Sequence, residues 1–499
     1  MERSVPSSID YSNVLPQAIP AIARRRKFYP QNGTSFNFNG SREIRIEIGS
    51  VNSLMDASHS YFEFTVENTG PNTFGFDMGG GNCMFKSMRV EQGGRVLTEI
   101  QEYNILHSGI LNPSQDSHDG QVTSSLINLQ RGFNGIGAGP AAITATAAAG
   151  QDAIVYGNVR HNSNNMMSAA GGAATTYTFS IPLMTGLFTQ DKLIPLPLVS
   201  QNAPITVVYE IDDSANVGVW NNFPAAGELS IINAAINAQL IEVGRDALDQ
   251  IRSVRDMSGG QLAISGQDIE YSSDQLPAAT VGDFIARVPA RKRSMKSLLF
   301  NIQSNTFANG GAGLNIGTVY NLSYAGCANM VSYQLKVGGL TYPPTAIDAF
   351  QAEAPAAAGV GEFNRSECIM ELAKALGTLS FRNPTGRLNT LTYGVAGNAV
   401  SGITNGDTGD GAGVTLAPGS NEVMVACPFG LDLEAFQHTA IQSGVDTQTL
   451  SQESNLVLTI GPGAGAIVGS GIQPKTINMY VIYDQHYYFG SDGMITFSN

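Results

Sequence analysis

The feature that most constrains the fold of this chain is an internal duplication. Met88–Gly94 is an alternating stretch that runs into two glycines, and Tyr333–Gly339 repeats the pattern 245 residues later. Further pairs of landmarks recur in the same order at similar separations. A threonine follows each Gly-Gly turn (Thr98 and Thr345, 247 residues apart), and a proline follows an apolar stretch (Pro182 and Pro428, 246 residues apart). An Ile-Asn pair comes later in each copy (Ile236-Asn237 and Ile477-Asn478, 241 residues apart). Repeats at one offset indicate two copies of one structural unit.

Alternation of apolar and polar residues dominates the chain and predicts half-buried β-strands. Glu43–Ile48 places isoleucine on one face and charge on the other, and Tyr61–Val66 does the same with aromatic residues. Each copy then holds about eight antiparallel strands, as in a jelly roll, although a plain tandem of β-sandwiches fits the same count. Further strands are predicted at Lys86–Glu91, Thr176–Ile181, Ile205–Ile211, Ala234–Val243, Ser297–Gln303, Tyr333–Val337, Glu422–Ala426, Asn455–Ile460, Thr476–Tyr483 and Met494–Phe497.

Few segments have helical periodicity. Thr98 is followed three residues later by Gln101, a capping pattern that predicts a short helix, and Thr345 is placed to begin its counterpart. Two further short helices are predicted, one from Asn364 to a stop at Gly377 and one at Asp246–Val254.

These elements divide the chain into an N-terminal arm (1–28), a first jelly roll (29–245), a linker (246–260) and a second jelly roll (261–499). The predicted fold class is all-β: two tandem eight-stranded jelly rolls with long loop insertions and a few short helices. The longest glycine-rich stretches are too small and polar to build a core, and we expect them to form loops: 112–174, 304–330, 352–362 and 394–420.

Composition limits the possible partners. Of the 499 residues, 42% are hydrophobic, only 14% are charged, and the formal net charge is −14. A chain this acidic is not expected to bind nucleic acid as a whole, because phosphates attract clustered Lys and Arg. Two local basic segments are the exceptions, each expected to be solvated or to face a partner: Arg24, Arg25, Arg26 and Lys27, and the run Arg287–Lys296.

The cysteines and the N-terminus indicate no secretory route. The first residues lack the apolar core of a signal peptide, and no apolar run approaches the roughly 18 residues of a membrane span. The cysteines are widely separated, which favours buried thiols in a reducing compartment over a disulfide framework: Cys83, Cys327, Cys368 and Cys427.

The sequence contains few patterns that are typical of catalytic or ligand-binding sites. The glycine run Gly135–Ala142 lacks the strand and helix that flank a dinucleotide site, and Asn405–Gly411 lacks the spacing and the glutamate of a calcium-binding EF-hand. Asp212 and Asp213 are adjacent, so on a strand they point to opposite faces. We therefore expect no enzyme, no cofactor, no metal site and no small-molecule substrate.

Several stretches carry a resemblance to a known family. They are the Asn-Gly turn of Phe36–Gly40, the two strand–Gly-Gly units, the segment Ile181–Leu196, and the closing Tyr480–Gln485 with Gly493. In this order, and over nearly the whole chain from Tyr29, they resemble the double jelly-roll major capsid proteins of tailless icosahedral dsDNA viruses. The likeness is strongest to those of polinton-like viruses and virophages.

The resemblance implies a structural role in a virion. In this family three chains form a pseudo-hexagonal homotrimer, and the trimers tile an icosahedral shell around a dsDNA genome. The implied partners are other copies of the chain and the penton and other minor capsid proteins, after synthesis in the host cytoplasm or nucleus. The basic arm residues Arg24, Arg25, Arg26 and Lys27 would face inward, toward the genome or an inner membrane.

Other hypotheses stay open. A minor capsid, penton or fibre protein is one, although a penton protein usually has one jelly roll. A carbohydrate-binding tandem β-sandwich is another, although the single tryptophan, Trp220, counts against it. A cupin-like enzyme would need clustered His and Glu on paired strands, which the sequence does not supply.

Overall fold

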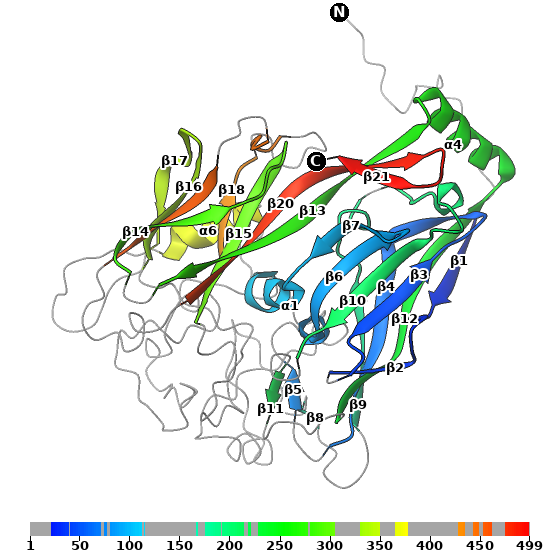
Figure 1. Ribbon diagram of the computed structural model, residues 1–499, viewed down its shortest axis with the longest axis horizontal. Helices are drawn as coiled ribbons and strands as arrows, with labels where there is room; N and C mark the ends of the chain where they lie inside the picture. The colour runs from blue at the N-terminus through cyan, green and yellow to red at the C-terminus, as the bar shows by residue number, and fades with distance from the viewer. Residues whose placement is uncertain are drawn as a thin grey trace, which may run out of the picture.

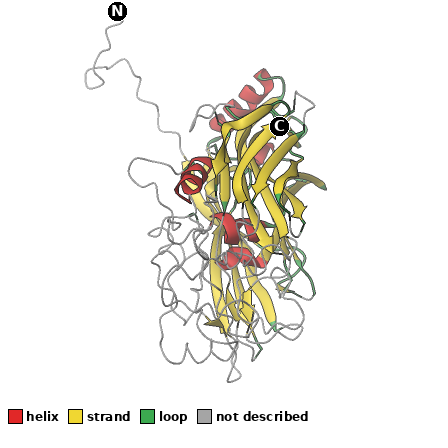
Figure 2. Ribbon diagram, turned by 90° about the vertical axis from the view of Figure 1, so that its left-hand side faces the viewer, coloured by secondary structure: helices red, strands yellow, loops and turns green. Residues whose placement is uncertain are grey.

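The chain was analysed as a computed structural model. It describes residues 21–38, 40–70, 74–76, 80–111, 114, 166–167, 175–190, 192–213, 218–220, 228–277, 280–304, 330–349, 365–377, 428–434, 443–448, 453–461 and 475–498. The glycine run 135–142, the loop 405–411, the predicted strand 422–426 and most of the predicted long loops lie outside these residues. Strands make up most of the described chain, and the helices are few and short (Figure 2).

Eight strands of the first half form two antiparallel sheets, in the orders β1-β12-β4-β9 and β3-β10-β6-β7 (Figure 1). Counted along the chain, the first strand pairs with the eighth, the second with the seventh, the third with the sixth and the fourth with the fifth. This connectivity is that of a jelly roll. The strands are β1 (Ala21–Phe28), β3 (Glu43–Ile48), β4 (Ser53–Asn68), β6 (Phe85–Gln92), β7 (Arg95–Ile100), β9 (Thr175–Pro182), β10 (Ile205–Ile211) and β12 (Leu229–Val243).

The second half repeats this connectivity strand for strand, in the orders β13-β20-β15-β18 and β14-β19-β16-β17. Its strands are β13 (Gln261–Leu276), β14 (Gly282–Val288), β15 (Met295–Ser304), β16 (Met330–Val337), β17 (Leu340–Asp348), β18 (Phe429–Asp432), β19 (Ser454–Ile460) and β20 (Lys475–Gly490). Five short strands are additional: β2 (Ser35–Asn37) on β12, β21 (Ile495–Ser498) on β20, and a small sheet of β5 (Phe74–Phe76), β8 (Met166–Met167) and β11 (Gly218–Trp220).

Equivalent strands carry the landmarks of the sequence repeat. β6 and β16 are the fourth strands of their jelly rolls, and both run into the predicted Gly-Gly turns. An isolated β-bridge between Met55 and Ile194 recurs between Met295 and Val445, and reciprocal backbone hydrogen bonds of 2.8–2.9 Å close both bridges. The prediction of two jelly rolls is confirmed, and the sandwich alternative is excluded by the connectivity.

Two of the predicted helices exist and two do not. The helix α6 (Arg365–Ala375) and the helix α4 (Arg245–Met257), which connects the halves, are confirmed. Thr98 and Thr345, however, lie in β7 and β17, because each Gly-Gly turn is a hairpin that returns the chain as a strand. The remaining helical segments are η1 (Gly80–Met84), α1 (Tyr103–Ile105), η2 (Leu106–Leu111) and η4 (Leu196–Leu198). None of the described helices has the length and apolarity needed to cross a bilayer.

Each jelly roll has its own aromatic cluster within one continuous hydrophobic core. In the first, the rings of Phe62 and Tyr209 stack with centroids 4.4 Å apart, joining the two sheets. In the second, Phe300 and Phe429 stack at 5.0 Å. Aromatic pairs in these geometries add to the stabilisation that burial of their area supplies.

The two jelly rolls meet along a close seam between β13 and the first half. Gly266 of β13 approaches Gly186 so closely that a Cβ atom on Gly266 would lie 2.0 Å from the Gly186 carbonyl oxygen. Farther along, the side-chain amide of Gln92 donates to the Gly493 carbonyl at 2.8 Å, and the Ile495 amide donates to Gln92 Oε1 at 2.6 Å. The seam therefore depends on backbone contact that only glycine permits.

The variant Gly266→Ala tests this contact. The added methyl group cannot fit without moving the backbone, so we expect the free energy of unfolding to fall by about 1–3 kcal/mol, as for overpacked cores. Gly339→Ala is the matched control, because a Cβ there meets no atom within 4 Å. Thermal unfolding measures both variants, and equal stability of the two would contradict the seam geometry.

Candidate functional site

The basic residues Arg24–Lys27 lie inside a strand and not ahead of the first strand. They belong to β1, which pairs with β12 and forms the right-hand edge of the first jelly roll in Figure 1. The expectation that this run precedes the first strand is therefore wrong; a run of charges has no apolar alternation to mark it as a strand. The predicted arm is described only from Ala21 to Phe28, and all eight of these residues are sheet residues.

The second basic run is partly internal. Lys292 and Lys296 are buried, and Lys292 Nζ pairs with Glu270 at 2.7 Å. Lys296 Nζ lies 2.8 Å from Glu434 and 3.2 Å from Asp484. Burial alone lowers the pKa of Lys296, but these two carboxylates outweigh burial, and the net pKa is raised. The amine is therefore held as a cation that ties strands together. Two of the five cations of this run are buried, whereas Arg287, Arg291 and Arg293 are exposed.

A buried carboxyl group, Asp268 of β13, marks the centre of the seam. The hydroxyl of Thr98, across the seam in β7, donates to Asp268 Oδ2. The Ile269 and Gly186 amides donate to Oδ1 at 3.0 and 3.4 Å, and the Tyr483 hydroxyl donates to Oδ2 at 3.4 Å. Burial raises the pKa of Asp268 despite these donors. Thr98, expected to cap a helix, thus serves the contact between the jelly rolls.

A second buried group at the seam is His107 in η2, which packs beside β15 of the second jelly roll. Burial lowers the pKa of His107 to about 3. Its ring centroid lies 4.4 Å from that of Tyr103, and no described residue hydrogen-bonds to Nε2. The hydroxyl of Tyr480 crosses the seam to the Glu102 carbonyl at 2.8 Å, and burial raises the pKa of the Glu102 carboxyl.

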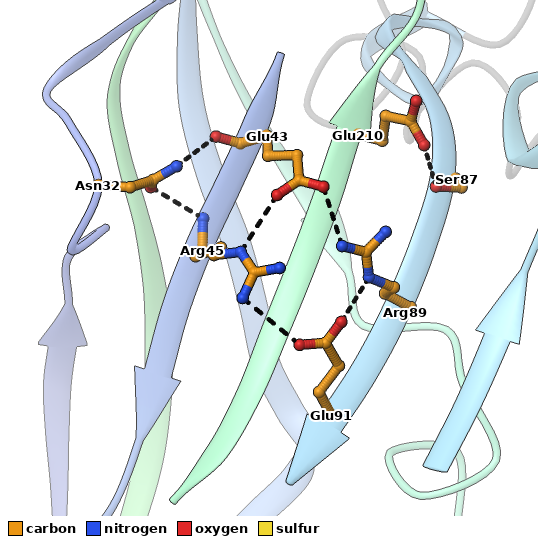
Figure 3. Close-up of polar contacts among 7 residues, drawn as sticks. All are labelled: Asn32, Glu43, Arg45, Ser87, Arg89, Glu91 and Glu210. Atoms are coloured by element: carbon orange, nitrogen blue, oxygen red, sulfur yellow. Dashed lines mark hydrogen bonds and ion pairs between the residues drawn. The ribbon is translucent and has the colours of Figure 1, made fainter. Parts of the chain in front are cut away.

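The outer face of the sheet β3-β10-β6-β7 carries four charged residues that satisfy one another (Figure 3). Arg45 contacts Glu43 at 3.1 Å and Glu91 at 3.6 Å, and Arg89 contacts Glu91 at 2.6 Å and Glu43 at 2.9 Å. We call these residues the ion ring. Val208 pairs with both arginines, so the ring lies over a buried valine. Its two cations and two anions leave the ion ring itself without net charge.

Neighbouring polar contacts hold the ion ring in place. Asn32 donates to the Glu43 carbonyl at 2.7 Å and accepts from the Arg45 amide at 3.1 Å, which fixes the strand that bears both residues (Figure 3). The Ser87 hydroxyl donates to Glu210 Oε2 at 3.0 Å on the adjoining strands. The face is thus a pre-ordered polar surface, in which few side chains need to be reordered on contact with another molecule.

The equivalent face of the second jelly roll has different chemistry. Val457 of β19 takes the place of Val208, and its strand neighbours are Ile285 and Gln334 where the first copy has arginines. Ile285 is 57% exposed. The two copies therefore share a backbone and differ in the surface that they present.

Ser58, His59 and Asp56 bring together the residue types of a catalytic triad, but their geometry does not fit one. Ser58 Oγ lies 3.2 Å and Asp56 Oδ2 2.8 Å from the same nitrogen of His59, Nδ1. A triad needs the hydroxyl and the carboxylate on opposite ring nitrogens. No group of three or more potential metal ligands occurs in the part of the chain that the structure describes. Cys83 and Cys368 are buried, whereas Cys327 and Cys427 lie outside that part.

Comparison with known proteins finds matches among solved structures. No protein-family model and no curated protein matches the sequence. The chain is similar to the PBCV-1 protein VP54 fitted into a reconstruction of the virophage Sputnik, with a TM-score of 0.53 and 10% identity over 98% of this chain and 99% of that one. The fold is a double jelly roll.

Two more structures support this conclusion. The cryo-EM structure of the Sputnik virophage matches with a TM-score of 0.52 and 10% identity, over 100% of this chain and 93% of that one. The PBCV-1 virus capsid model matches with a TM-score of 0.50 and 11% identity, over 98% and 99%. At this identity the likeness establishes the double jelly-roll fold alone.

The buried His107 makes the stability of the double jelly roll pH-dependent. Because the folded pKa is lowered, the stabilisation is complete above pH 6.5 and is lost as the pH falls toward about 3. We expect the free energy of unfolding to drop by about 1 kcal/mol between neutral pH and pH 5.5 from this group alone. His107→Leu should remove that part of the slope, which denaturant unfolding at each pH measures.

The titration of Asp268 must be separated from that of His107 in this experiment. Asp268 acts in the opposite direction, because its raised pKa gives stability that is lost as the pH rises. Its contribution is common to the wild type and His107→Leu and cancels in their difference. Parallel slopes for the wild type and His107→Leu would contradict the assignment.

Proposed function

We propose that this chain is a major capsid protein, a structural subunit of an icosahedral viral shell and not an enzyme. The observation that carries the proposal is the presence of two complete jelly rolls, joined by a closely packed seam, with no further folded unit among the described residues. The match to the PBCV-1 virus capsid model along nearly the full length of both chains supports it. A structural subunit needs a rigid body and specific surfaces, and the fold supplies both.

The geometry suits a pseudo-hexagonal capsomer. Three chains would supply six jelly rolls of one backbone, which gives a nearly six-fold outline from a three-fold assembly. The different outer faces, with the ion ring on one copy and Ile285 on the other, let each jelly roll recognise one type of neighbour. Such homotrimers would tile a shell around a dsDNA genome, as the resemblance to polinton-like virus and virophage proteins implies.

The partners follow from this role. The chain would contact other copies of itself, and penton and other minor capsid proteins at the vertices and under the shell. We place Arg24, Arg25, Arg26 and Lys27 on the inward side, where the genome or an inner membrane lies. The protein would be made in the host cytoplasm or nucleus and would function in the virion.

Sedimentation of the purified chain tests the proposal. We expect a trimer of about 158 kDa, three times the chain mass of 52.7 kDa, with a pseudo-hexagonal outline in negative stain. A folded monomer at micromolar concentration would contradict it and would favour the alternative of a carbohydrate-binding tandem domain. A pentamer would favour a penton protein.

A further inference from the structure

The strand β1 forms one edge of the sheet β1-β12-β4-β9. Among the described residues it pairs only with β12, along all eight of its positions. In Figure 1 it is the outermost ribbon of the first jelly roll. The backbone edge away from β12 therefore has no strand beside it in the described structure. Such an edge is a template for another strand, and natural proteins generally block it.

Every side chain of β1 before Phe28 is exposed, on both faces of the strand. Arg26 lies over the Phe28 ring at 4.9 Å, which places it and Arg24 on the face that turns toward the core. Arg25 lies over the Tyr61 ring at 5.3 Å on the opposite face, which Lys27 shares. The four cations thus alternate above and below the free edge.

Carboxylates of the same sheet neutralise only part of this charge. Arg24 pairs with Glu242 at 3.3 Å. Lys27 and Arg25 share Glu63, at 2.6 and 3.8 Å. Arg26 has no ion pair with any described carboxylate. Four cations therefore face two anions, and an excess of positive charge remains along the edge.

The free edge of β1 and its excess positive charge favour one class of binding partner over others. A second copy of β1 is disfavoured, because pairing would set four cations against four. A membrane or a DNA duplex would approach β1 from one side, so it would contact the cations of only one face at a time. An extended acidic segment that adds to the edge would place carboxylates beside the cations of both faces, since its own side chains alternate in the same way.

We propose that β1 is a docking site for an extended acidic segment of another protein, which adds to the sheet as a further strand beside Arg24, Arg25, Arg26 and Lys27. The backbone edge provides hydrogen bonds, and the alternating cations provide selectivity for consecutive acidic residues. The inference does not depend on the capsid role, because it concerns only the edge of one sheet.

A designed peptide tests the proposal on the full-length protein. The probe is an end-capped, labelled eight-residue peptide with four consecutive glutamates between threonine and valine residues. We expect saturable binding by fluorescence anisotropy, and slower hydrogen exchange of the 21–28 amides when the peptide is bound. The same peptide with all backbone amides N-methylated keeps its charge, and we expect it to bind at least about tenfold more weakly because it cannot join a ladder.

Matched variants locate the site. The double variant Arg24→Glu with Arg26→Glu should weaken binding at least about tenfold, because it places like charges opposite the peptide. Arg291→Glu with Arg293→Glu changes the net charge equally at exposed positions of the second jelly roll, and should leave the affinity within about twofold. The exchange measurement on the wild type does not depend on how well either variant folds.

The remaining outcomes overturn the proposal. Equal binding of the N-methylated peptide would show plain charge attraction without strand addition. Absence of peptide binding would show that the cations only prevent edge-to-edge aggregation. Protection of the 21–28 amides by phosphatidylserine vesicles or duplex DNA, and not by the peptide, would assign the strand to a lipid or nucleic-acid surface.

Discussion

The contact between Gly186 and Gly266 is the constraint on which the rest of the molecule depends. Two jelly rolls on a flexible tether would behave as separate domains, whereas here backbone touches backbone and buried polar groups cross the same seam. Asp268 and His107 both lie beside it in surroundings that favour their neutral forms. The seam thus joins the two copies by backbone and buried polar contacts, which suits the proposed role of a shell subunit.

Duplication with divergence gives this body its specificity. The backbone connectivity of the two copies is the same, down to the paired bridges at Met55 and Met295. The surface chemistry differs, because a closed ion ring covers one outer face and an exposed Ile285 stands on the other. In the proposed trimer, the six jelly rolls would share one backbone and present two kinds of outer surface. That combination would let the trimers pack closely and still distinguish their neighbours.

The alternation of apolar and polar residues predicted the strands that have one buried face and one solvent-exposed face. Glu43–Ile48 alternates strictly, and its predicted bounds are those of β3. The sequence did not reveal β1, whose two faces are both exposed, nor the burial of Lys292 and Lys296, because basic residues ordinarily lie on the surface. The contact between the jelly rolls could not be predicted from the sequence either. Gly186 and Gly266 resemble any other loop or strand glycine until the fold brings them together. The pattern at Thr98 predicted a helix cap, because it depends only on neighbouring residues.

We propose that this double jelly roll is the repeating unit of a shell. Electron microscopy of the purified protein at high concentration tests the proposal. We expect closed shells or planar hexagonal arrays, in which each lattice position is a pseudo-hexagonal trimer of six jelly rolls. Folded protein that remains dispersed and forms no lattice would contradict it.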